Sequence, residues 1–384
     1  MMAETVTHKL QEREPNGITI DCSEALVDPK WDSFLRQLPG AHYEQTSVWA
    51  QFRRHYGWRP IRWVACRDDR VVGGIQVLVH PLPQFGDIAY IVRGPMCEEG
   101  QAYLEDRLVD KVTMYARQHR FVYQVFDCPY NSKTLGHILD RRGYTLHPPG
   151  IPPSGLITAT LVLDLEQSLD NLLKNMGANA RRNIRYGEKA GFEMALGGEE
   201  HLDTFRELML AICRRRGTAP SPPQPDFFKK LWEVAGSSGF ARLFLVRLGE
   251  EVVSAAFAFT IGDTIRVWKV GWSGAYQNKY PNHLMWWSII RWAKENGFKL
   301  FDFVWVDDHD AKLLAQGEKR PEAFRDGTTR FKMGFGGRLV MIPNARSQFF
   351  HPAFRWFARS GGMRLIRSRI SQQLLHRLWS RSAG

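Results

Sequence analysis

The same order of predicted strands and helices occurs twice along this chain, and this repeat constrains the fold more than any other sequence feature. Residues 59–81 read as two strands around a polar turn, and residues 240–272 read as three strands around two turns. A helix follows in each half, at 101–118 and at 281–297, and a further strand comes after it. The layout predicts two similar units in tandem.

Two short motifs bring the copies into register. Val71-Val72 corresponds to Val252-Val253 at an offset of 181 residues, and Phe126-Asp127 corresponds to Phe301-Asp302 at an offset of 175. A near-constant offset over several elements predicts an internal duplication. Hairpins followed by a helix and another strand predict mixed sheets covered by helices, which is an α/β class with two tandem domains.

The segment HPPGIPPSG, residues 147–155, separates the two copies. Its four prolines and two glycines cannot continue a helix or a central strand. We therefore expect an N-terminal tail, a first domain, a second domain and a C-terminal tail. Their predicted ranges are 1–20, 21–150, 151–345 and 346–384.

Positive charge is concentrated at the end of the chain. The 52 basic and 40 acidic residues give a net charge of +12, yet no acidic residue follows Asp326, where eleven basic residues occur. Apolar residues then recur at spacings of three and four, which predicts a basic amphipathic helix; they are Met363, Ile366, Ile370, Leu374 and Leu378. Such a tail favours an anionic partner, either nucleic acid or an acidic membrane surface.

Several familiar chemistries lack their motifs. The five cysteines are scattered without a CxxC pair, and no HExxH, Walker or GxGxxG sequence is present. GWSGA, residues 271–275, is not a GxSxG elbow because it ends in alanine. Asp307-Asp308-His309-Asp310 predicts a solvated loop and no metal site. We also expect a cytoplasmic protein, since there is neither a secretory signal nor a run of about 20 apolar residues.

TTRFKMGFGG, residues 328–337, is the most unusual segment. If it is extended, period two sorts its side chains onto two faces: Phe331, Met333 and Phe335 on one, and Lys332, Gly334 and Gly336 on the other. A lysine beside two glycines has open space around it, where a substrate backbone or phosphate could approach. The alternative is an exposed lysine on an edge strand weakened by glycine.

The chain resembles the FemABX peptidyltransferases over about residues 30–345. The matching motifs, in chain order, are Gln45, Trp49 and Arg53; Arg93-Gly94-Pro95; Phe126-Asp127; ARRNIRYGEKAG; PNHLMWW with WAKENG; and RFKMGFGG. The resemblance implies two GNAT-like domains and transfer of an amino acid from aminoacyl-tRNA to the stem peptide of a peptidoglycan precursor. Since no long charged helical hairpin interrupts the second half, the chain is similar to the shorter, arm-less members.

The resemblance also implies roles for individual residues. Lys332 matches the lysine at the reacting centre, where a fixed cation stabilises the tetrahedral intermediate or the phosphate at the tRNA end, and Phe331 matches its aromatic neighbour. Arg53, on the same helix face as Trp49, matches a residue that holds precursor phosphates. Asp127 matches a carboxylate proposed as the base for the attacking amine; a structural aspartate at the end of a strand is the alternative.

The chain departs from the family pattern in its second half. Pro223 and Phe227 stand nearest to the positions where family members place an arginine and a tyrosine, so the phosphate clamp is incomplete. Val270 replaces a pocket tyrosine, whose space Trp268 or Trp272 could fill. The implied chemistry requires no cofactor, because an aminoacyl ester is already activated.

Two other functions remain open. A CoA-dependent GNAT-type N-acyltransferase would share the fold, but it needs a glycine-rich turn where this chain has AYQNKYPNHLMWW. A non-enzymatic RNA- or membrane-binding protein would explain the basic tail but not Lys332. The sequence also leaves open whether the precursor is nucleotide-linked or lipid-linked, and whether the tail meets tRNA or an anionic membrane.

Overall fold

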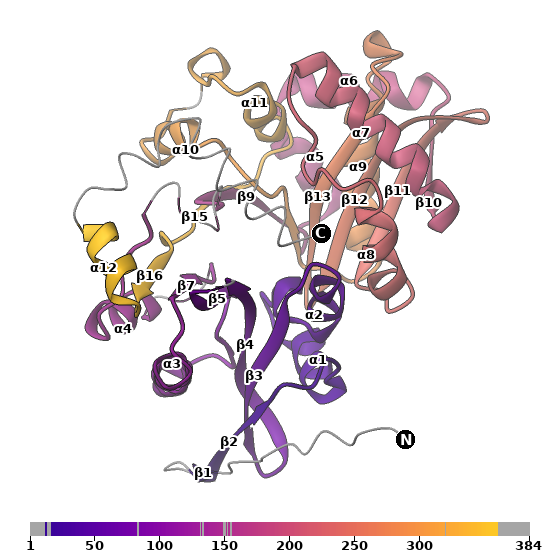
Figure 1. Ribbon diagram of the computed structural model, residues 1–384. Coiled ribbons are helices and arrows are strands. Elements are labelled where there is room, and N and C mark those ends of the chain that lie inside the picture. The colour runs from indigo at the N-terminus through magenta and orange to yellow at the C-terminus, as the bar shows by residue number, and fades with distance from the viewer. Residues whose placement is uncertain are drawn as a thin grey trace. The chain divides into compact units, whose positions relative to one another are not determined.

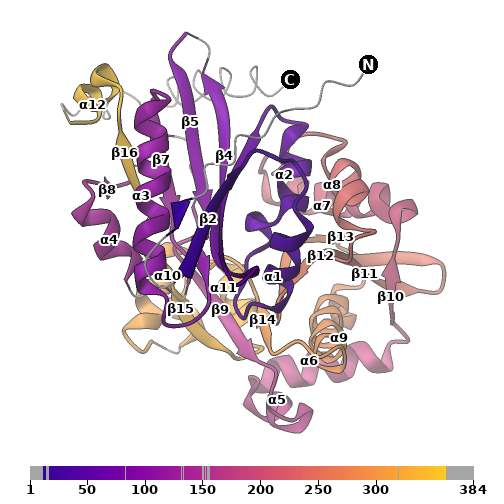
Figure 2. The same ribbon diagram turned by 90° about the horizontal axis from the view of Figure 1, so that it is seen from below.

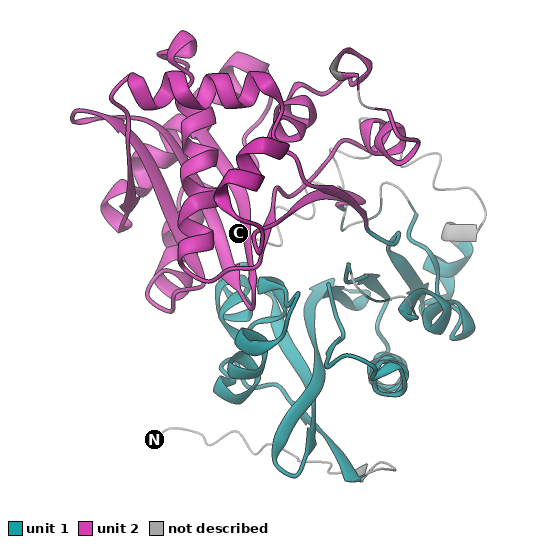
Figure 3. Ribbon diagram, turned by 180° about the vertical axis from the view of Figure 1, so that it is seen from behind, with its two compact units in different colours: residues 1–156, 342–384 teal, residues 157–341 magenta. Residues whose placement is uncertain are grey.

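The chain forms two compact units in a computed structural model (Figure 3). Unit 1 comprises residues 1–156 and 342–384, and unit 2 comprises residues 157–341. The structure describes residues 12–13, 17–82, 84–130, 132, 134–148, 151, 153, 156–318 and 320–359. Each unit is built on its own mixed sheet, as Figure 1 shows.

Unit 1 holds one sheet and the helices that pack on it. Its strands are β1 (Glu12–Arg13), β2 (Ile18–Ser23), β3 (Arg59–Arg67), β4 (Arg70–Leu82), β5 (Gly86–Val92), β6 (Met96–Cys97), β7 (Tyr123–Asp127), β8 (Thr145–Leu146) and β16 (Arg346–Phe349). Its helices are α1 (Pro29–Gln37), the 3₁₀ helix η2 (Tyr43–Gln45), α2 (Ser47–Arg54), α3 (Ala102–Gln118), α4 (Leu135–Arg141) and α12 (Pro352–Arg359).

The strand order in this sheet is β1-β2-β3-β4-β5-β7-β16-β8, with β6 beside β4. Among the described strands, β5 and β7 pair in parallel and the other neighbours are antiparallel. The strand β16 comes from the far end of the chain, yet it lies against β7 (Figure 1). Unit 1 is therefore completed by residues that follow unit 2 in the sequence.

Two adjacent glycines show how helices cover both faces of this sheet. A Cβ atom at Gly73 would meet Leu104 of α3, whereas a Cβ at Gly74 would meet Trp31 of α1. Because consecutive strand residues point to opposite faces, α3 and α1 lie on opposite sides of β4, an arrangement that Figure 2 also displays. The glycines let both helices approach the strand closely.

Unit 2 has the same kind of architecture. Its strands are β9 (Ala159–Asp164), β10 (Glu193–Gly197), β11 (Ala241–Leu248), β12 (Glu251–Ile261), β13 (Thr264–Trp272), β14 (Leu300–Asp302) and β15 (Arg338–Met341). Its α-helices are α5 (Leu169–Asn175), α6 (Ala178–Lys189), α7 (Leu202–Arg216), α8 (Phe227–Ala235), α9 (Pro281–Glu295), α10 (Asp308–Ala315) and α11 (Gly327–Met333).

The sheet of unit 2 has the order β10-β11-β12-β13-β14-β9-β15, and β13–β14 is its parallel pair. Phe257 of β12 contacts Phe205 of α7 and Phe228 of α8 at ring distances of 6.0 and 5.4 Å. Its neighbour Ala256 belongs instead to the core cluster that contains Trp286 of α9. Helices α7–α8 and α9 therefore cover opposite faces.

The predicted duplication and fold class are confirmed. The elements β3, β4, β5, α3 and β7 of unit 1 recur as β11, β12, β13, α9 and β14 of unit 2, each time with one parallel pair at the end of the series. The motifs Val71-Val72 and Val252-Val253 both lie at the start of the second strand of a hairpin.

The predicted domain ranges need correction at three places. Residues 18–20 begin the strand β2, which pairs with β3, so they are not part of a tail. Unit 2 begins at residue 157 and ends at residue 341. Residues 346–349 do not belong to a helical tail, because they form the strand β16 and pair with β7 in unit 1. The amphipathic helix predicted around Met363–Leu378 lies outside the described residues. Among the residues that are described, no helix is both long and apolar enough to cross a bilayer.

The buried amide of Gln45 joins the two central strands of unit 1 and constrains its neighbour Gly94. Gln45 Nε2 donates to Gln76 O at 3.2 Å and to Val92 O at 2.6 Å, and its Oε1 accepts from Gln76 N at 2.8 Å. The side chain is fully buried. It therefore links β4 to β5 at a place where the two strands no longer pair directly with each other.

We expect Gly94→Ala to destabilise the protein by about 1 to 3 kcal/mol, because overpacking a tight site has that cost. The new Cβ would lie 2.8 Å from the Gln45 amide, which cannot move without breaking its bonds to two strands. Chemical denaturation would measure the change. The control is Gly136→Ala in α4, where the nearest side-chain atom is 3.6 Å away. Equal stability of the two variants would contradict the bridging role of Gln45.

Candidate active site

The sheet of unit 2 opens where its parallel pair ends. Strands β13 and β14 share three residue pairs, the last of which is Arg266 opposite Asp302. Beyond this point β13 continues to Trp272, whereas the chain of β14 turns away through Val304 and Trp305. The space at the end of a parallel pair is a common position for a ligand site in α/β proteins.

Lys332 binds to this turn. Its Nζ donates to Val304 O at 2.9 Å and to Trp305 O at 2.7 Å, and it lies 5.8 Å from the centre of the Trp305 ring. The residue is only 6% exposed. An ammonium group has three N–H donors, so the turn accounts for two of them.

Burial lowers the pKa of Lys332 to about 8, against the opposing influence of Asp302 and Asp326, and Arg216 lowers it further. At neutral pH the group is therefore mostly charged, although its charge is held in a poorly solvated place. A fixed cation of this kind suits the stabilisation of a developing oxyanion, because it needs no reorganisation when the charge appears.

The local structure around Lys332 differs from the extended strand that the sequence predicted. Residues 327–333 form the helix α11, so the open face of Lys332, Gly334 and Gly336 does not exist. Asp326 caps this helix by accepting from Thr329 N at 2.5 Å. The alternation of apolar residues misled the prediction because Phe331 and Phe335 are also four residues apart, as on one face of a helix.

Phe331 lies beside Lys332 in an aromatic cluster. Its ring is 5.2 Å from that of Phe335 and 4.8 Å from that of His283, and Trp286 lies 6.1 Å away. Phe335 is fully buried, whereas Phe331 is half-buried. The packing of these rings anchors α11 to α9 and leaves part of Phe331 accessible.

Phe227 and Trp268 are brought together as a second aromatic group. Phe227 is the first residue of α8, and Trp268 lies on the part of β13 that no longer pairs with β14. Their rings are 5.8 Å apart. Lys269 adds a cation 5.3 Å from the Trp268 ring, and burial lowers the pKa of this lysine.

In unit 1, α2 carries Trp49 and Arg53 as expected. Trp49 is 5% exposed and its ring packs against those of Tyr43 and Phe52, both at 5.1 Å, so it is a core residue. Arg53 lies 4.9 Å from the ring of Trp58. Its Nε has no hydrogen-bond partner within the described part of the chain, and burial lowers the pKa of the guanidinium. A buried donor of this kind favours an anionic ligand.

Asp127 ends β7 in a buried ion pair. Its Oδ1 lies 3.1 Å from Arg93 Nη1, and both side chains are almost fully buried. Arg93 also donates to Cys128 O at 2.8 Å and lies over the ring of Tyr130 at 4.9 Å. Burial raises the pKa of Asp127 to about 6, although Arg93 opposes the shift. The pairing supports a structural role, whereas the pKa is compatible with a base at neutral pH.

The acidic segment after β14 is a structural cluster. Ligand atoms of Asp307, His309 and Asp310 lie within 4.8 Å of one another, but the carboxylates are engaged in hydrogen bonds. Asp307 accepts from the Arg325 guanidinium, and the buried Asp310 accepts from the backbone N–H of Arg325 and Asp326, each at 3.0 Å. The predicted solvated loop is thus wrong, because α10 begins here and its carboxylates fix the segment that leads into α11.

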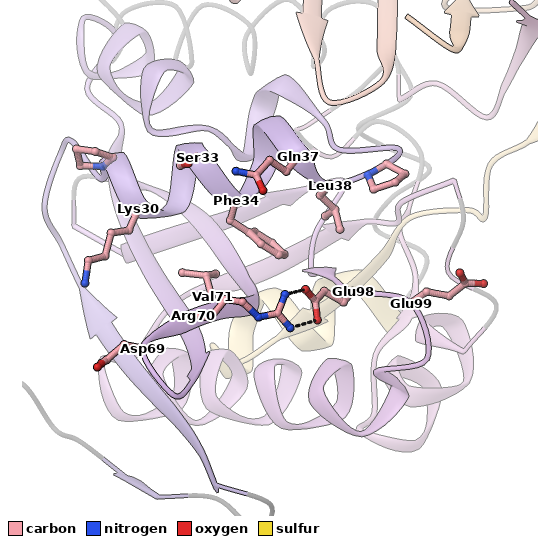
Figure 4. Close-up of a pocket in the computed structure, with 12 residues that line it drawn as sticks. Lys30, Ser33, Phe34, Gln37, Leu38, Asp69, Arg70, Val71, Glu98 and Glu99 are labelled. Carbon is pink, nitrogen blue, oxygen red and sulfur yellow. Dashed lines mark hydrogen bonds and ion pairs between the residues drawn. The ribbon is translucent and has the colours of Figure 1, made fainter. Parts of the chain in front are cut away.

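A hollow of about 640 Å³ in unit 1 lies apart from these residues (Figure 4). Helix α1 and the turn between β3 and β4 form its walls, and Arg70 and Glu98 join across it through two hydrogen bonds of 2.6 and 3.1 Å. None of the predicted site residues lines it.

Sequence reasoning missed Arg266, Asp302 and the turn at Val304–Trp305. The signal for Asp302 was present, since the repeat aligned it with Asp127. Arg266 and the turn had no such signal, because their roles depend on the register of β13 with β14 and on two left-handed backbone conformations.

Comparisons with known proteins identify the family. The FemAB family model matches residues 26–238, which is more than half of the chain. The chain belongs to the FemAB family. A second model, the acetyltransferase (GNAT) domain, matches residues 174–312, which cover most of unit 2.

Relatives of this FemAB family member agree with that assignment. The lipid II:glycine glycyltransferase of Staphylococcus aureus is 25% identical over 236 residues, which make up 58% of this chain and 54% of the relative. The chain thus spans about half the length of the curated relatives it matches. A crystal structure of FemX superimposes with a TM-score of 0.73 at 18% identity, covering 86% of this chain and 97% of FemX. A tandem GNAT protein from the clavulanic acid pathway has a TM-score of 0.50 at 12% identity and covers 87% and 99%. These likenesses confirm two tandem GNAT-like domains.

We expect Asp127→Asn to lower the free energy of unfolding more at pH 4 than at pH 7, because the wild-type carboxyl stabilises the fold only while it is protonated and the neutral amide has no such pH dependence. The double variant Arg93→Met with Asp127→Asn should recover part of this loss. Denaturant unfolding at pH 4 and pH 7 measures both.

The pH dependence provides the control. The pKa of Asp127 is raised from 3.8 to about 6 in the folded protein, so the folded state binds its proton more tightly than the unfolded state. The wild type should lose stability from this group as the pH rises from 4 to 6, and the Asn variants should lack that slope. An unchanged slope in the variants would contradict the assigned environment.

Proposed function

We propose that this protein is an aminoacyltransferase that moves an amino acid from aminoacyl-tRNA to the stem-peptide amine of a peptidoglycan precursor, as in the formation of cell-wall bridges. Family membership and the glycyltransferase relative support the reaction class. The observation that carries the proposal is the buried ammonium of Lys332, held by two carbonyls at the opening of the unit 2 sheet.

The reaction joins a neutral amine to an activated ester. The amine nitrogen forms a bond to the ester carbonyl carbon, the carbonyl oxygen becomes an oxyanion, and the bond to the tRNA hydroxyl oxygen then breaks. The amine loses a proton, and the departing hydroxyl oxygen gains one. Lys332 stabilises the oxyanion, and Asp127 is the proposed base for the amine. The ester needs no further activation, so the proposal includes no cofactor.

The remaining site residues have binding roles in this proposal. Arg53 holds a precursor phosphate, because its buried Nε lacks a partner among the described residues. Phe331 and Trp268, which are half-buried, offer aromatic surfaces on which a base or the transferred residue can pack, and the buried Phe227 supports Trp268. Trp49 supports Arg53 from the core, since it is buried one helical turn before it.

A CoA-dependent N-acyltransferase is the second candidate, since a GNAT domain model matches unit 2. A CoA pyrophosphate binds best to free backbone N–H groups at the start of a helix. The helix α9 starts with Pro281, which has no N–H, and Tyr280 before it adopts a left-handed conformation at φ 56°. The start of α9 therefore makes a poor site for a CoA pyrophosphate, which argues against this candidate.

We also propose that the protein works in the cytoplasm and contacts an anionic membrane where a lipid-linked precursor is exposed. Trp356 of α12 is 70% exposed and Phe85, in the turn between β4 and β5, is 52% exposed. Phe85 packs edge-on against Phe354 of α12 at 5.6 Å, so the turn and the helix form one surface. Arg120 and Arg355 add exposed positive charge there. Aromatic and basic residues together favour the interface of an anionic bilayer.

We expect Lys332→Met to lower the rate of transfer by about 100- to 1000-fold, the usual effect of removing one oxyanion donor. Single-turnover transfer from charged tRNA to a lipid-linked precursor, followed by mass spectrometry, measures it. Lys299→Met, which removes an exposed lysine, is the control. With the wild type, the rate should fall as the pH rises through about 8, because Lys332 then loses its charge. Transfer by Lys332→Met at the wild-type rate, or equal transfer from acyl-CoA, would refute the proposal.

The membrane contact predicts a specific loss. Phe85→Ser with Trp356→Ser should weaken binding to phosphatidylglycerol vesicles about tenfold, since lost apolar burial of about 1.4 kcal/mol has that effect. Vesicle sedimentation measures the binding. Leu196→Ser, at a 51% exposed position on β10, is the matched control. Unchanged vesicle binding together with weakened tRNA binding would assign this surface to nucleic acid.

A further inference from the structure

Asp302 lies two residues before the turn that holds Lys332. Its carboxylate is 1% exposed and accepts from Thr160 Oγ1 at 2.6 Å and from Val304 N at 2.8 Å. These two bonds join the end of β14 to the neighbouring strand β9 and to the first residue of the turn. The carboxylate therefore fixes where the backbone leaves the sheet.

The turn is held in a conformation that its residues disfavour. Val304 has φ 54° and Trp305 has φ 27°, although neither is glycine. A β-branched residue in the left-handed region is strained and keeps that conformation only when its surroundings impose it. The bond from Val304 N to Asp302 is such a constraint, and the carbonyls of these two strained residues are the ones that accept from Lys332.

Arg266 is the direct counter-charge of the buried Asp302 carboxylate. Its Nε lies 3.3 Å from Asp302 Oδ2, and the residue is 3% exposed. It faces Asp302 across the last pair of the parallel strands. Because Arg266 supplies the direct counter-charge, Lys332 binds to neutral carbonyls rather than to a carboxylate.

We propose that Asp302 is the positioning residue of Lys332: it fixes the Val304–Trp305 turn, whose two carbonyls orient the ammonium and leave its third N–H for the substrate. This inference rests on the proposed function, in which Lys332 contacts the reacting atoms. Removing Asp302 would let the turn relax toward ordinary backbone angles and move the ammonium. A displacement of about 1 Å at a reacting centre lowers a rate about 100-fold.

Three single variants of the full-length protein test the inference. Asp302→Asn keeps the size of the side chain but removes its charge. Thr160→Val removes one donor to the carboxylate with little change in shape. Thr260→Val is the matched control, because Thr260 is also a buried strand threonine, and its hydroxyl donates to Gly239 O at 2.7 Å rather than to Asp302. Thermal unfolding, kcat, KM and an NMR titration of the Lys332 side chain are measured for each.

Asp302→Asn should lower kcat about 10- to 100-fold with KM within about twofold, since an interaction realised in the transition state is lost. Thr160→Val should lower kcat in the same direction by a smaller factor and shift the titration midpoint of Lys332. Thr260→Val should leave kcat and that midpoint unchanged at a similar loss of stability. If Thr160→Val and Thr260→Val lose kcat in the same proportion to their loss of stability, Asp302 is merely structural and the inference is overturned.

Two further outcomes are also decisive. Asp302→Asn could fail to fold because Arg266 loses its partner, and then the difference in kcat between Thr160→Val and Thr260→Val decides the matter. If the wild type transfers no amino acid to the precursor, the proposed function fails, but the titration still tests the positioning. In that case a midpoint of Lys332 that is the same in Thr160→Val, which keeps the charge of Asp302, as in the wild type overturns the inference.

Discussion

A buried arginine–aspartate ion pair stands at the end of the parallel strands in each unit, and the neighbouring structure is built around it. Arg93 and Asp127 are 3.1 Å apart in unit 1, and Arg266 and Asp302 are 3.3 Å apart in unit 2. Removing two charges from water is expensive, so such a pair is stable only when both groups keep further hydrogen bonds. One member of each pair makes such a bond to the backbone just after the strand, since Arg93 donates to Cys128 O and Asp302 accepts from Val304 N. The buried pair therefore also fixes the conformation of the loop that follows.

The two copies of this arrangement have diverged in what they support. In unit 1, Arg93 donates its backbone N–H to Asp127 O and its guanidinium to Cys128 O, so the pair ties the ends of β5 and β7 to each other. In unit 2 the corresponding carboxylate binds Thr160 and the turn that holds Lys332. The same arrangement thus occurs in both units, and in unit 2 it supports the turn that binds the lysine of α11.

Much of the fold was readable from the sequence, because the duplication rests on hydrophobic periodicity and on repeated motifs. The strands around Val71 and Val252 were predicted from their sequence pattern, and the helices predicted at 101–118 and 281–297 are found as α3 and α9. The segment around Lys332 failed because Phe331 and Phe335 satisfy both a strand and a helix period, and the deciding contact is the cap from Asp326. Trp49 was assigned to the site with Arg53 because they share a helix face, but burial can only be judged once Tyr43 and Phe52 are in place.

The strand β16 has a consequence for how the chain acquires its structure during synthesis. The backbone of β7 is paired with β5 on one side and with residues 346–349 on the other. A ribosome releases the N-terminal residues first, so β7 waits with one unpaired edge while the whole of unit 2 is made. Unpaired strand edges invite association with other chains. Unit 2, which is continuous from residue 157 to residue 341, can complete its sheet before the unit that precedes it in the sequence.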